Sequence, residues 1–198
     1  MNLDTNYALF SNNEENTFVK DSFADGMIVK AKPSDAFIEF VSNLVELSGV
    51  DTINLDTLHQ TVLYAKKQYS PKLIEFVEKL GKNAKYSIMS PYLNIFENQK
   101  NEVILAIGFI CPALQQLNLQ LQKDFGVTHS FPELKLHMTL NYNYDETKGD
   151  RKRRLDTLSR LIQNTPSWKS PEFYLHKLTV APIQNDYDDE IQTVFLDV

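Results

Sequence analysis

The two segments that decide the fold are His59-Gln-Thr-Val-Leu-Tyr64 and His137-Met-Thr-Leu-Asn-Tyr142, and both follow the pattern His-x-Thr-apolar-x-Tyr. Side chains alternate between two faces along a β-strand, so each segment presents an imidazole and a hydroxyl side by side on one face. Strict alternation also predicts that Leu63 lies on the face of the histidine and Tyr64 on the opposite face. Each segment is therefore expected to supply half of a polar site.

The same order of secondary-structure elements precedes each His-x-Thr segment. An apolar strand ends at a proline, an amphipathic helix follows and ends at a glycine, and the His-x-Thr strand comes next. The first copy is expected to place these elements at 26–32, 34–49 and 58–65, and the second copy at 102–111, 112–126 and 135–144. The prediction is completed by a helix over 71–80 that ends before Gly81, short strands at 86–89 and 93–97, a helix capped by Asp150, and strands at 172–183 and 192–198.

This repeat predicts two similar lobes that are related by an approximate two-fold axis. The lobes are expected over about 25–100 and about 101–198, within a single domain over 25–198. Residues 1–24 are polar and acidic and are interpreted as an N-terminal arm. Under this symmetry, the two His-x-Thr pairs face each other across a cleft.

The composition limits the class of protein. The chain has 198 residues, with 20 Lys or Arg, 26 Asp or Glu and a net charge of −6. An acidic protein lacks a broad basic surface, so we expect no long nucleic acid as a partner, whereas a small anionic ligand can bind in a local pocket. One cysteine cannot form an internal disulfide, and the sequence carries no recognisable signal peptide or membrane-spanning run. We therefore expect a soluble, cytoplasmic protein that does not bind membranes.

Two imidazoles and two hydroxyls suit acid–base chemistry on a phosphodiester. Near neutral pH, one histidine can accept a proton while the other donates one. Threonine hydroxyls can donate hydrogen bonds to the non-bridging phosphate oxygens, where negative charge accumulates. The candidate catalytic residues are His59, Thr61, His137 and Thr139, and the pattern leaves open which histidine is the base.

A metal site is the main chemical alternative, because imidazoles bind zinc. Catalytic zinc usually has three protein ligands, and neither segment has a carboxylate or cysteine in the right alternation, so we expect no metal and no other cofactor. His129 and His176 stand alone and are interpreted as ordinary loop or strand residues, and Cys111 is expected to be buried and inert. A single His-x-Thr strand is more often structural, and the second copy is what favours a functional site.

Paired His-x-Thr strands in a chain of this size resemble the two-histidine (2H) phosphoesterase superfamily. The stretches 26–33, 58–64 and 126–142 are similar to the phage anti-CBASS protein 1 family, and the similarity extends over about 26–144. It implies a bilobal α+β fold of two antiparallel sheets, with helices packed outside and the four candidate residues lining a central cleft. It also implies metal-independent cleavage of 3′–5′ bonds in cyclic di- or trinucleotides such as cGAMP, by attack of a ribose 2′-hydroxyl on the adjacent phosphate. These cyclic nucleotides are the alarm signals of CBASS defence, so a phage-encoded enzyme would act in the cytoplasm of the bacterial host.

Base recognition is expected to use aromatic faces, because a stacked base contributes about 1–3 kcal/mol. Phe96 and Tyr92 are the candidate substrate-binding residues, and filling of the core is the alternative interpretation of both. The basic run over 148–154 is either a solvated helix face or a surface that attracts the phosphates of the ligand. Three other functions stay open: a phosphodiesterase for RNA 2′,3′-cyclic phosphate or 2′–5′ oligoadenylate, a sponge that binds cyclic nucleotides without cutting them, and a purely structural protein. The oligomeric state is not indicated.

Overall fold

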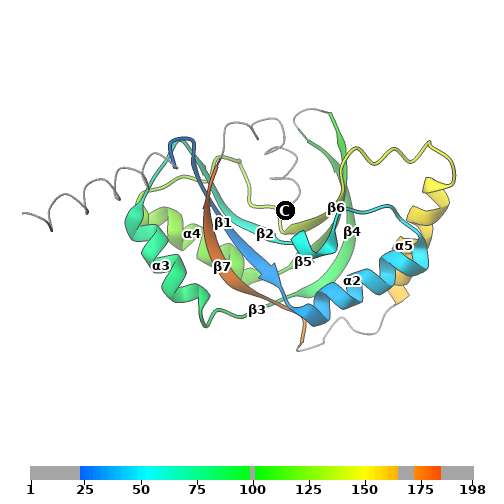
Figure 1. The fold of residues 1–198 in the computed structure, drawn as a ribbon, viewed down its shortest axis with the longest axis horizontal. Helices are drawn as coiled ribbons and strands as arrows, with labels where there is room; N and C mark the ends of the chain where they lie inside the picture. Colours follow the sequence, from blue (N-terminus) through cyan, green and yellow to red (C-terminus); the bar gives the residue numbers. More distant parts are fainter. Residues whose placement is uncertain (1–22, 99–100, 165–171, 184–198) are drawn as a thin grey trace, which may run out of the picture.

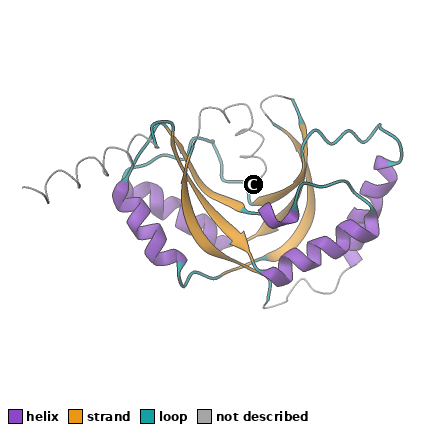
Figure 2. Cartoon of the chain, viewed as in Figure 1, coloured by secondary structure: helices purple, strands orange, loops and turns teal. Residues whose placement is uncertain are grey.

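Seven strands in the described part of the chain form two antiparallel sheets, as the sequence predicts (Figure 1). The computed structural model describes residues 23–98, 101–164 and 172–183. The first sheet has the order β2-β1-β7-β3, with β1 at Gly26–Pro33, β2 at Gln60–Lys66, β3 at Tyr86–Ser87 and β7 at Tyr174–Pro182. The second sheet has the order β4-β5-β6, with β4 at Met89–Glu97, β5 at Val103–Ile110 and β6 at His137–Asn141. The result is an α+β fold in which the sheets stand in the middle and helices flank them (Figure 2).

Local sequence signals explain where the helices begin and end. The Oγ atoms of Ser34 and Ser70 accept hydrogen bonds from the first turns of α2 and α3, and Gly49 and Gly126 end α2 and α4 in the left-handed conformation. The described residues form the α-helices α2 (Asp35–Ser48), α3 (Pro71–Gly81), α4 (Pro112–Phe125) and α5 (Arg151–Asn164). The predicted ends of α2 and α4 are therefore confirmed.

Two local predictions are wrong for identifiable reasons. Gly81 is the last residue of α3 rather than the residue after it, and a Cβ at this position would lie 2.3 Å from the carbonyl oxygen of Leu178. Glycine is needed there because the helix approaches β7 closely. The short strands predicted at 86–89 and 93–97 are in fact Tyr86–Ser87 and Met89–Glu97. Pro91 therefore lies inside β4, which tolerates it because β4 is at the edge of its sheet.

The two halves of the chain exchange strands. The order β1-α2-β2-α3 is followed by β5-α4-β6-α5, so the elements repeat. The strand β4, which follows α3 and the two-residue strand β3, joins the second sheet, and β7, which follows α5, joins the first. Consequently β2-β1-β7 and β6-β5-β4 have equivalent orders. The helices also pack on strands from the other half of the chain. Helix α3 from the first half packs on β7 from the second, and α5 from the second half packs on β4 from the first.

Both His-x-Thr strands contain a bulge at the same position. Between β1 and β2, Lys30 pairs with Thr61 and Val29 pairs with Leu63, so Val62 is skipped. Between β5 and β6, Ala106 pairs with Thr139 and Leu105 with Asn141, so Leu140 is skipped. The fold thus repeats a local irregularity as well as an order of elements.

The bulge makes the strict alternation predicted for the first strand wrong. Leu63 packs in the main hydrophobic core, whereas Tyr64 belongs to a smaller cluster with Ile28. Ile28 and Lys30 lie on one face of β1, so their partners Tyr64 and Thr61 share a face of β2.

Three other predictions concern Cys111, membrane-spanning helices and the two ends of the chain. Cys111 is buried as expected, and burial raises the pKa of its thiol. None of the described helices is both long and apolar enough to span a bilayer. The strand predicted at 192–198 and nearly all of the arm at 1–24 lie outside the described residues.

Candidate active site

A short turn fixes the ring of His59 just before β2. The 3₁₀ helix Leu55–Thr57 is capped by Asn54, whose Oδ1 accepts a hydrogen bond from the backbone of Asp56 at 3.1 Å. His59 Nδ1 lies 2.7 Å from the carbonyl oxygen of Thr57, and a carbonyl only accepts, so Nδ1 carries the proton. In the neutral ring Nε2 then has a free lone pair. This atom is buried and has no hydrogen-bond partner among the described residues.

His137 is held in the same way at the start of β6. Its Nδ1 lies 3.1 Å from the carbonyl oxygen of Lys135, two residues earlier, as in the case of His59 and Thr57. The side chain is buried, and the edge of its ring meets Phe96 with the centroids 5.0 Å apart. The two halves of the chain therefore orient their imidazoles by equivalent contacts.

Thr61 and Thr139 carry buried hydroxyls with no partner in the described part of the chain. Thr61 is 3% exposed and Thr139 is 0% exposed, and neither Oγ1 has a hydrogen-bond partner there. Buried polar groups are nearly always hydrogen-bonded in folded proteins, because each unsatisfied group costs about 1–3 kcal/mol. Two such hydroxyls at equivalent positions indicate a site built to receive polar atoms of a ligand.

Gln60 joins the two halves of the site, and sequence reasoning missed it. Its Oε1 accepts a hydrogen bond from the backbone N–H of His137 at 2.6 Å, and its Nε2 donates to the carbonyl oxygens of Lys135 and Thr61. The fully buried carboxamide therefore connects the start of β2 to the start of β6. The sequence signal that could have identified Gln60 is its polarity, because the equivalent residue of the second segment is the apolar Met138.

The electrostatic environment keeps His59 uncharged. Its pKa lies at about 3, below the ordinary 6.5, mainly because of burial and then because of the positive charge of Lys30 and the influence of His137. The bond to the Thr57 carbonyl opposes this shift only in part. His137 contributes to the low pKa of His59, and Gln60, the residue after His59, accepts a hydrogen bond from the backbone N–H of His137. Both observations place the two histidines in one region of the fold.

Of the two predicted substrate-binding aromatics, Phe96 contacts the ring of His137, and Tyr92 is separated from His137 by one strand. Gly108 pairs with Tyr92 on one side and with His137 on the other, and the ring of Tyr92 covers this glycine so closely that a Cβ would lie 2.4 Å from it. Tyr92 is 47% exposed, so it does not fill the core. Tyr92 and Phe96 line a pocket of about 430 Å³ together with Asn94, Gln115, Glu133 and Lys135.

The other histidines do not join this site through any contact described. His129 accepts a hydrogen bond at Nδ1 from the backbone N–H of Tyr64 at 3.0 Å, and His176 lies in β7 opposite Lys32. Both are loop or strand residues, as predicted. Within the residues that the structure describes, no three His, Cys, Asp or Glu side chains are grouped so as to hold a metal ion.

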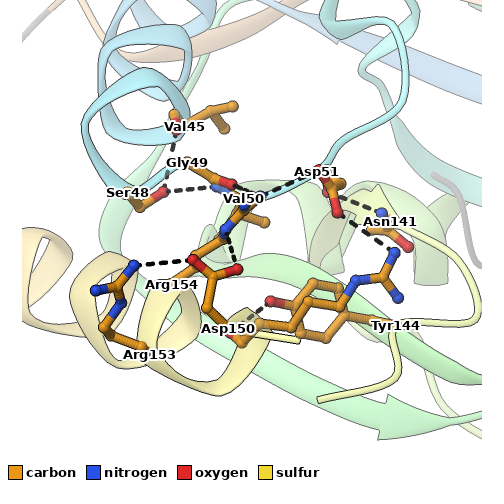
Figure 3. Close-up of polar contacts among 11 residues, drawn as sticks. Val45, Ser48, Gly49, Val50, Asp51, Asn141, Tyr144, Asp150, Arg153 and Arg154 are labelled. Carbon is orange, nitrogen blue, oxygen red and sulfur yellow. Dashed lines mark hydrogen bonds and ion pairs between the residues drawn. The ribbon is translucent and has the colours of Figure 1, made fainter. Parts of the chain in front are cut away.

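The basic run over 148–154 forms ion pairs with three aspartates: Lys148 pairs with Asp145, and the arginines pair with Asp51 and Asp150, as Figure 3 shows for Asp150. Asp51, in the loop after α2, lies 3.3 Å from Arg151 and 3.4 Å from Arg154. Asp150 directly precedes α5, and its carboxylate binds Arg153 and Arg154 at 2.9 and 2.8 Å. Arg154 also donates to the carbonyl oxygen of Gly49 at 2.7 Å. These contacts support a structural role for the run, in holding α5 against the end of α2.

One comparison with known proteins identifies a family for this chain. No curated protein matches the chain. The model of the family described as anti-CBASS protein Acb1 matches residues 25–163 and therefore includes all six predicted site residues: Tyr92, Phe96 and the two His-Thr pairs. This match covers well over half of the sequence and confirms the resemblance to the anti-CBASS family. The chain belongs to the anti-CBASS protein Acb1 family.

Proposed function

We propose that the protein is a phosphodiesterase that needs no metal and opens the ring of cyclic di- or trinucleotides used as CBASS alarm signals. Among the described residues, five buried side-chain nitrogen or oxygen atoms have no hydrogen-bond partner. The observation that carries this proposal is that three of them, His59 Nε2, Thr61 Oγ1 and Thr139 Oγ1, belong to the two His-x-Thr pairs, while the other two are the Tyr142 hydroxyl and His176 Nε2. Membership of an anti-CBASS family supports the choice of substrate class. The enzyme would act in the cytoplasm of the infected cell.

The proposed reaction is an internal transesterification. One imidazole takes the proton of a ribose 2′-hydroxyl, and the 2′-oxygen attacks the adjacent phosphorus. The bond from phosphorus to the 5′-oxygen breaks, and the other imidazole gives a proton to that oxygen. The product is a linear nucleotide that ends in a 2′,3′-cyclic phosphate and has the same mass as the substrate.

The two threonines suit the transition state of this reaction. Charge builds up on the non-bridging oxygens of the five-coordinate phosphorus, and the hydroxyls of Thr61 and Thr139 can donate hydrogen bonds to these oxygens. Because the hydroxyls are already fixed on two bulged strands, little reorganisation is needed when the charge develops.

The pocket beside His137 suits a nucleobase. Tyr92 and Phe96 offer aromatic faces, and Lys135 Nζ lies 5.5 Å from the centre of the Phe96 ring. Asn94 and Glu133 add hydrogen-bonding groups that can contact the edge of a base. A cation near the aromatic ring and polar side chains around it are common features of sites that bind single nucleotides.

The test is incubation of purified protein with a panel of cyclic di- and trinucleotides in excess EDTA, followed by liquid chromatography and mass spectrometry. We expect an isomer of the substrate with a new retention time, or the same product with one added water after the cyclic phosphate opens. His59→Ala and His137→Ala should each lower the rate by at least about 10²-fold, the range of a lost proton-transfer group. The control His129→Asn, whose ring lies outside the cluster, should keep the activity.

Other outcomes identify the alternative functions. Intact ligand that is depleted from solution and recovered on denaturation would indicate a sponge. Intact free ligand together with cleavage of RNA 2′,3′-cyclic phosphate or 2′–5′ oligoadenylate would identify a different phosphodiesterase. Normal turnover in either histidine variant would contradict the proposed mechanism.

A further inference from the structure

The two halves of the site differ at one equivalent position next to the threonines. Because both strands carry the same bulge, the residue paired with Thr61 on β1 corresponds to the residue paired with Thr139 on β5. The first is Lys30 and the second is Ala106. Lys30 is half-buried, whereas Ala106 is fully buried and carries no charge. The first half-site therefore has a cation that the second lacks at this position.

The charge of Lys30 acts on the neighbouring imidazole. Lys30 on β1 pairs with Thr61 on β2, and Thr61 comes two residues after His59. The side chains of Lys30 and Thr61 therefore lie on the same face of the sheet. After burial, Lys30 is the largest cause of the low pKa of His59. The other groups that act on this ring are His137 from β6, which also lowers the pKa, and the Thr57 carbonyl, which raises it. Among the described residues no carboxylate contributes to this balance.

We propose that Lys30 is a positioning residue that breaks the symmetry of the site, so that His59 is the base and His137 is the acid. This inference rests on the proposed function. His59 Nε2 takes the 2′-hydroxyl proton, the 2′-oxygen bonds to phosphorus, and the departing 5′-oxygen receives the proton of protonated His137. The proton that His59 gained returns to solvent, and His137 takes one up, before the next cycle.

Binding of the substrate makes His59 a better base than it is in the free protein. In the free protein, Lys30 and burial keep the ring neutral, with Nδ1–H on the Thr57 carbonyl and the lone pair on Nε2. A bound phosphodiester carries a negative charge that offsets the charge of Lys30. The affinity of Nε2 for a proton then rises at the moment when the proton is to be transferred.

A substrate with a sulfur leaving group separates the two roles. In a cyclic dinucleotide whose scissile 5′-oxygen is replaced by sulfur, the thiolate leaves without protonation, because a thiol is far more acidic than an alcohol. We expect this substrate to restore the roughly 10²–10⁴-fold loss in His137→Ala and to leave His59→Ala inactive. Restoration of His59→Ala instead would overturn the assignment. Full activity of both variants on the ordinary substrate would refute the proposed function itself.

Variants of Lys30 test the cause of the asymmetry. We expect Lys30→Met to raise the midpoint of the His59 titration, followed by NMR of the free protein, and to move the acid limb of kcat/KM to higher pH. Lys30→Arg should retain the behaviour of the natural protein, because it keeps the charge. Lys123→Met removes the same charge from an exposed position on α4 and should change neither readout. An unchanged His59 titration in Lys30→Met would overturn the role of Lys30, whatever the activity.

Discussion

Thr61 and Thr139 each carry a hydroxyl that the fold buries without a hydrogen-bond partner among the described residues. Removing such a hydroxyl should cost the folded protein little, because no hydrogen bond within that part of the chain is lost. We therefore expect Thr61→Val or Thr139→Val to lower kcat by about 10²–10³-fold, as in the loss of one donor to a developing oxyanion. The free energy of unfolding, measured with denaturant, should stay the same or rise.

A threonine outside the site provides the control for this prediction. Thr157 donates its hydroxyl to the carbonyl oxygen of Arg153 on α5, and it lines a hollow with residues 46–49 at the end of α2 rather than with the His-x-Thr pairs. Thr157→Val should leave kcat unchanged. If the site variants raise KM without lowering kcat, the hydroxyls bind the ground state of the substrate and not the transition state.

At the scale of elements, Gln60 is the direct link between β2 and β6. Its carboxamide makes three hydrogen bonds to backbone groups of residues 61, 135 and 137. Gln60→Met, which copies Met138 at the equivalent position, leaves the His137 N–H without this acceptor. We expect the free energy of unfolding to fall by about 1–3 kcal/mol, and kcat to fall because the two half-sites lose their common anchor.

Gln60→Glu separates anchoring from packing. It keeps an oxygen that can accept from His137 but loses the two donated hydrogen bonds to carbonyl groups. An intermediate loss of kcat in Gln60→Glu would agree with anchoring through the backbone of His137. Equal activity in the natural protein and in both variants would show that the bridge plays no part in placing the histidines.

The sequence predicts the elements well because their signals are local. Ser34 and Gly49 mark the ends of α2, and the paired His-x-Thr segments indicate two related strands in one site. Strict alternation fails at Leu63 because a bulge is a property of two paired strands, and one strand alone does not reveal it. The role of Gln60 and the exchange of β4 and β7 likewise depend on contacts between segments that are distant in the sequence.

The distribution of charge over the whole molecule determines which cations can attract an anionic ligand. Arg151, Arg153 and Arg154 all bind Asp51 or Asp150, so two carboxylates offset most of their three positive charges. Figure 3 shows Arg153 and Arg154 beside Asp150. We expect the double variant Arg151→Ala and Arg153→Ala to leave the salt dependence of kcat/KM unchanged. Its free energy of unfolding should fall by no more than about 1 kcal/mol per lost ion pair, because these pairs are partly exposed. A weaker salt dependence would instead show that the run attracts substrate.

The stability of the whole protein should depend on pH through His129. The loop that contains it runs along β2, because the backbone N–H of Tyr64 donates to His129 Nδ1 at 3.0 Å and the N–H of Ser130 donates to the carbonyl oxygen of Tyr64 at 2.7 Å. Only an unprotonated Nδ1 can accept the first of these bonds. Burial lowers the pKa of His129 from 6.5 to about 4, so the folded state prefers the neutral ring more strongly than the unfolded state does.

The sign of this effect follows from the lowered pKa. The contribution of His129 to stability is fully present above pH 6.5 and decreases as the pH falls toward about 4, below which it is lost. The total loss is of the order of 3 kcal/mol, at about 1.4 kcal/mol for each pH unit. His59 adds a loss of the same sign over a window that reaches about pH 3. In His129→Asn the amide oxygen replaces Nδ1 as a pH-independent acceptor, so denaturant unfolding from pH 7 to pH 4 should show a shallower decline than in the natural protein. Parallel curves for the two proteins would show that His129 does not couple the β2 edge to protonation.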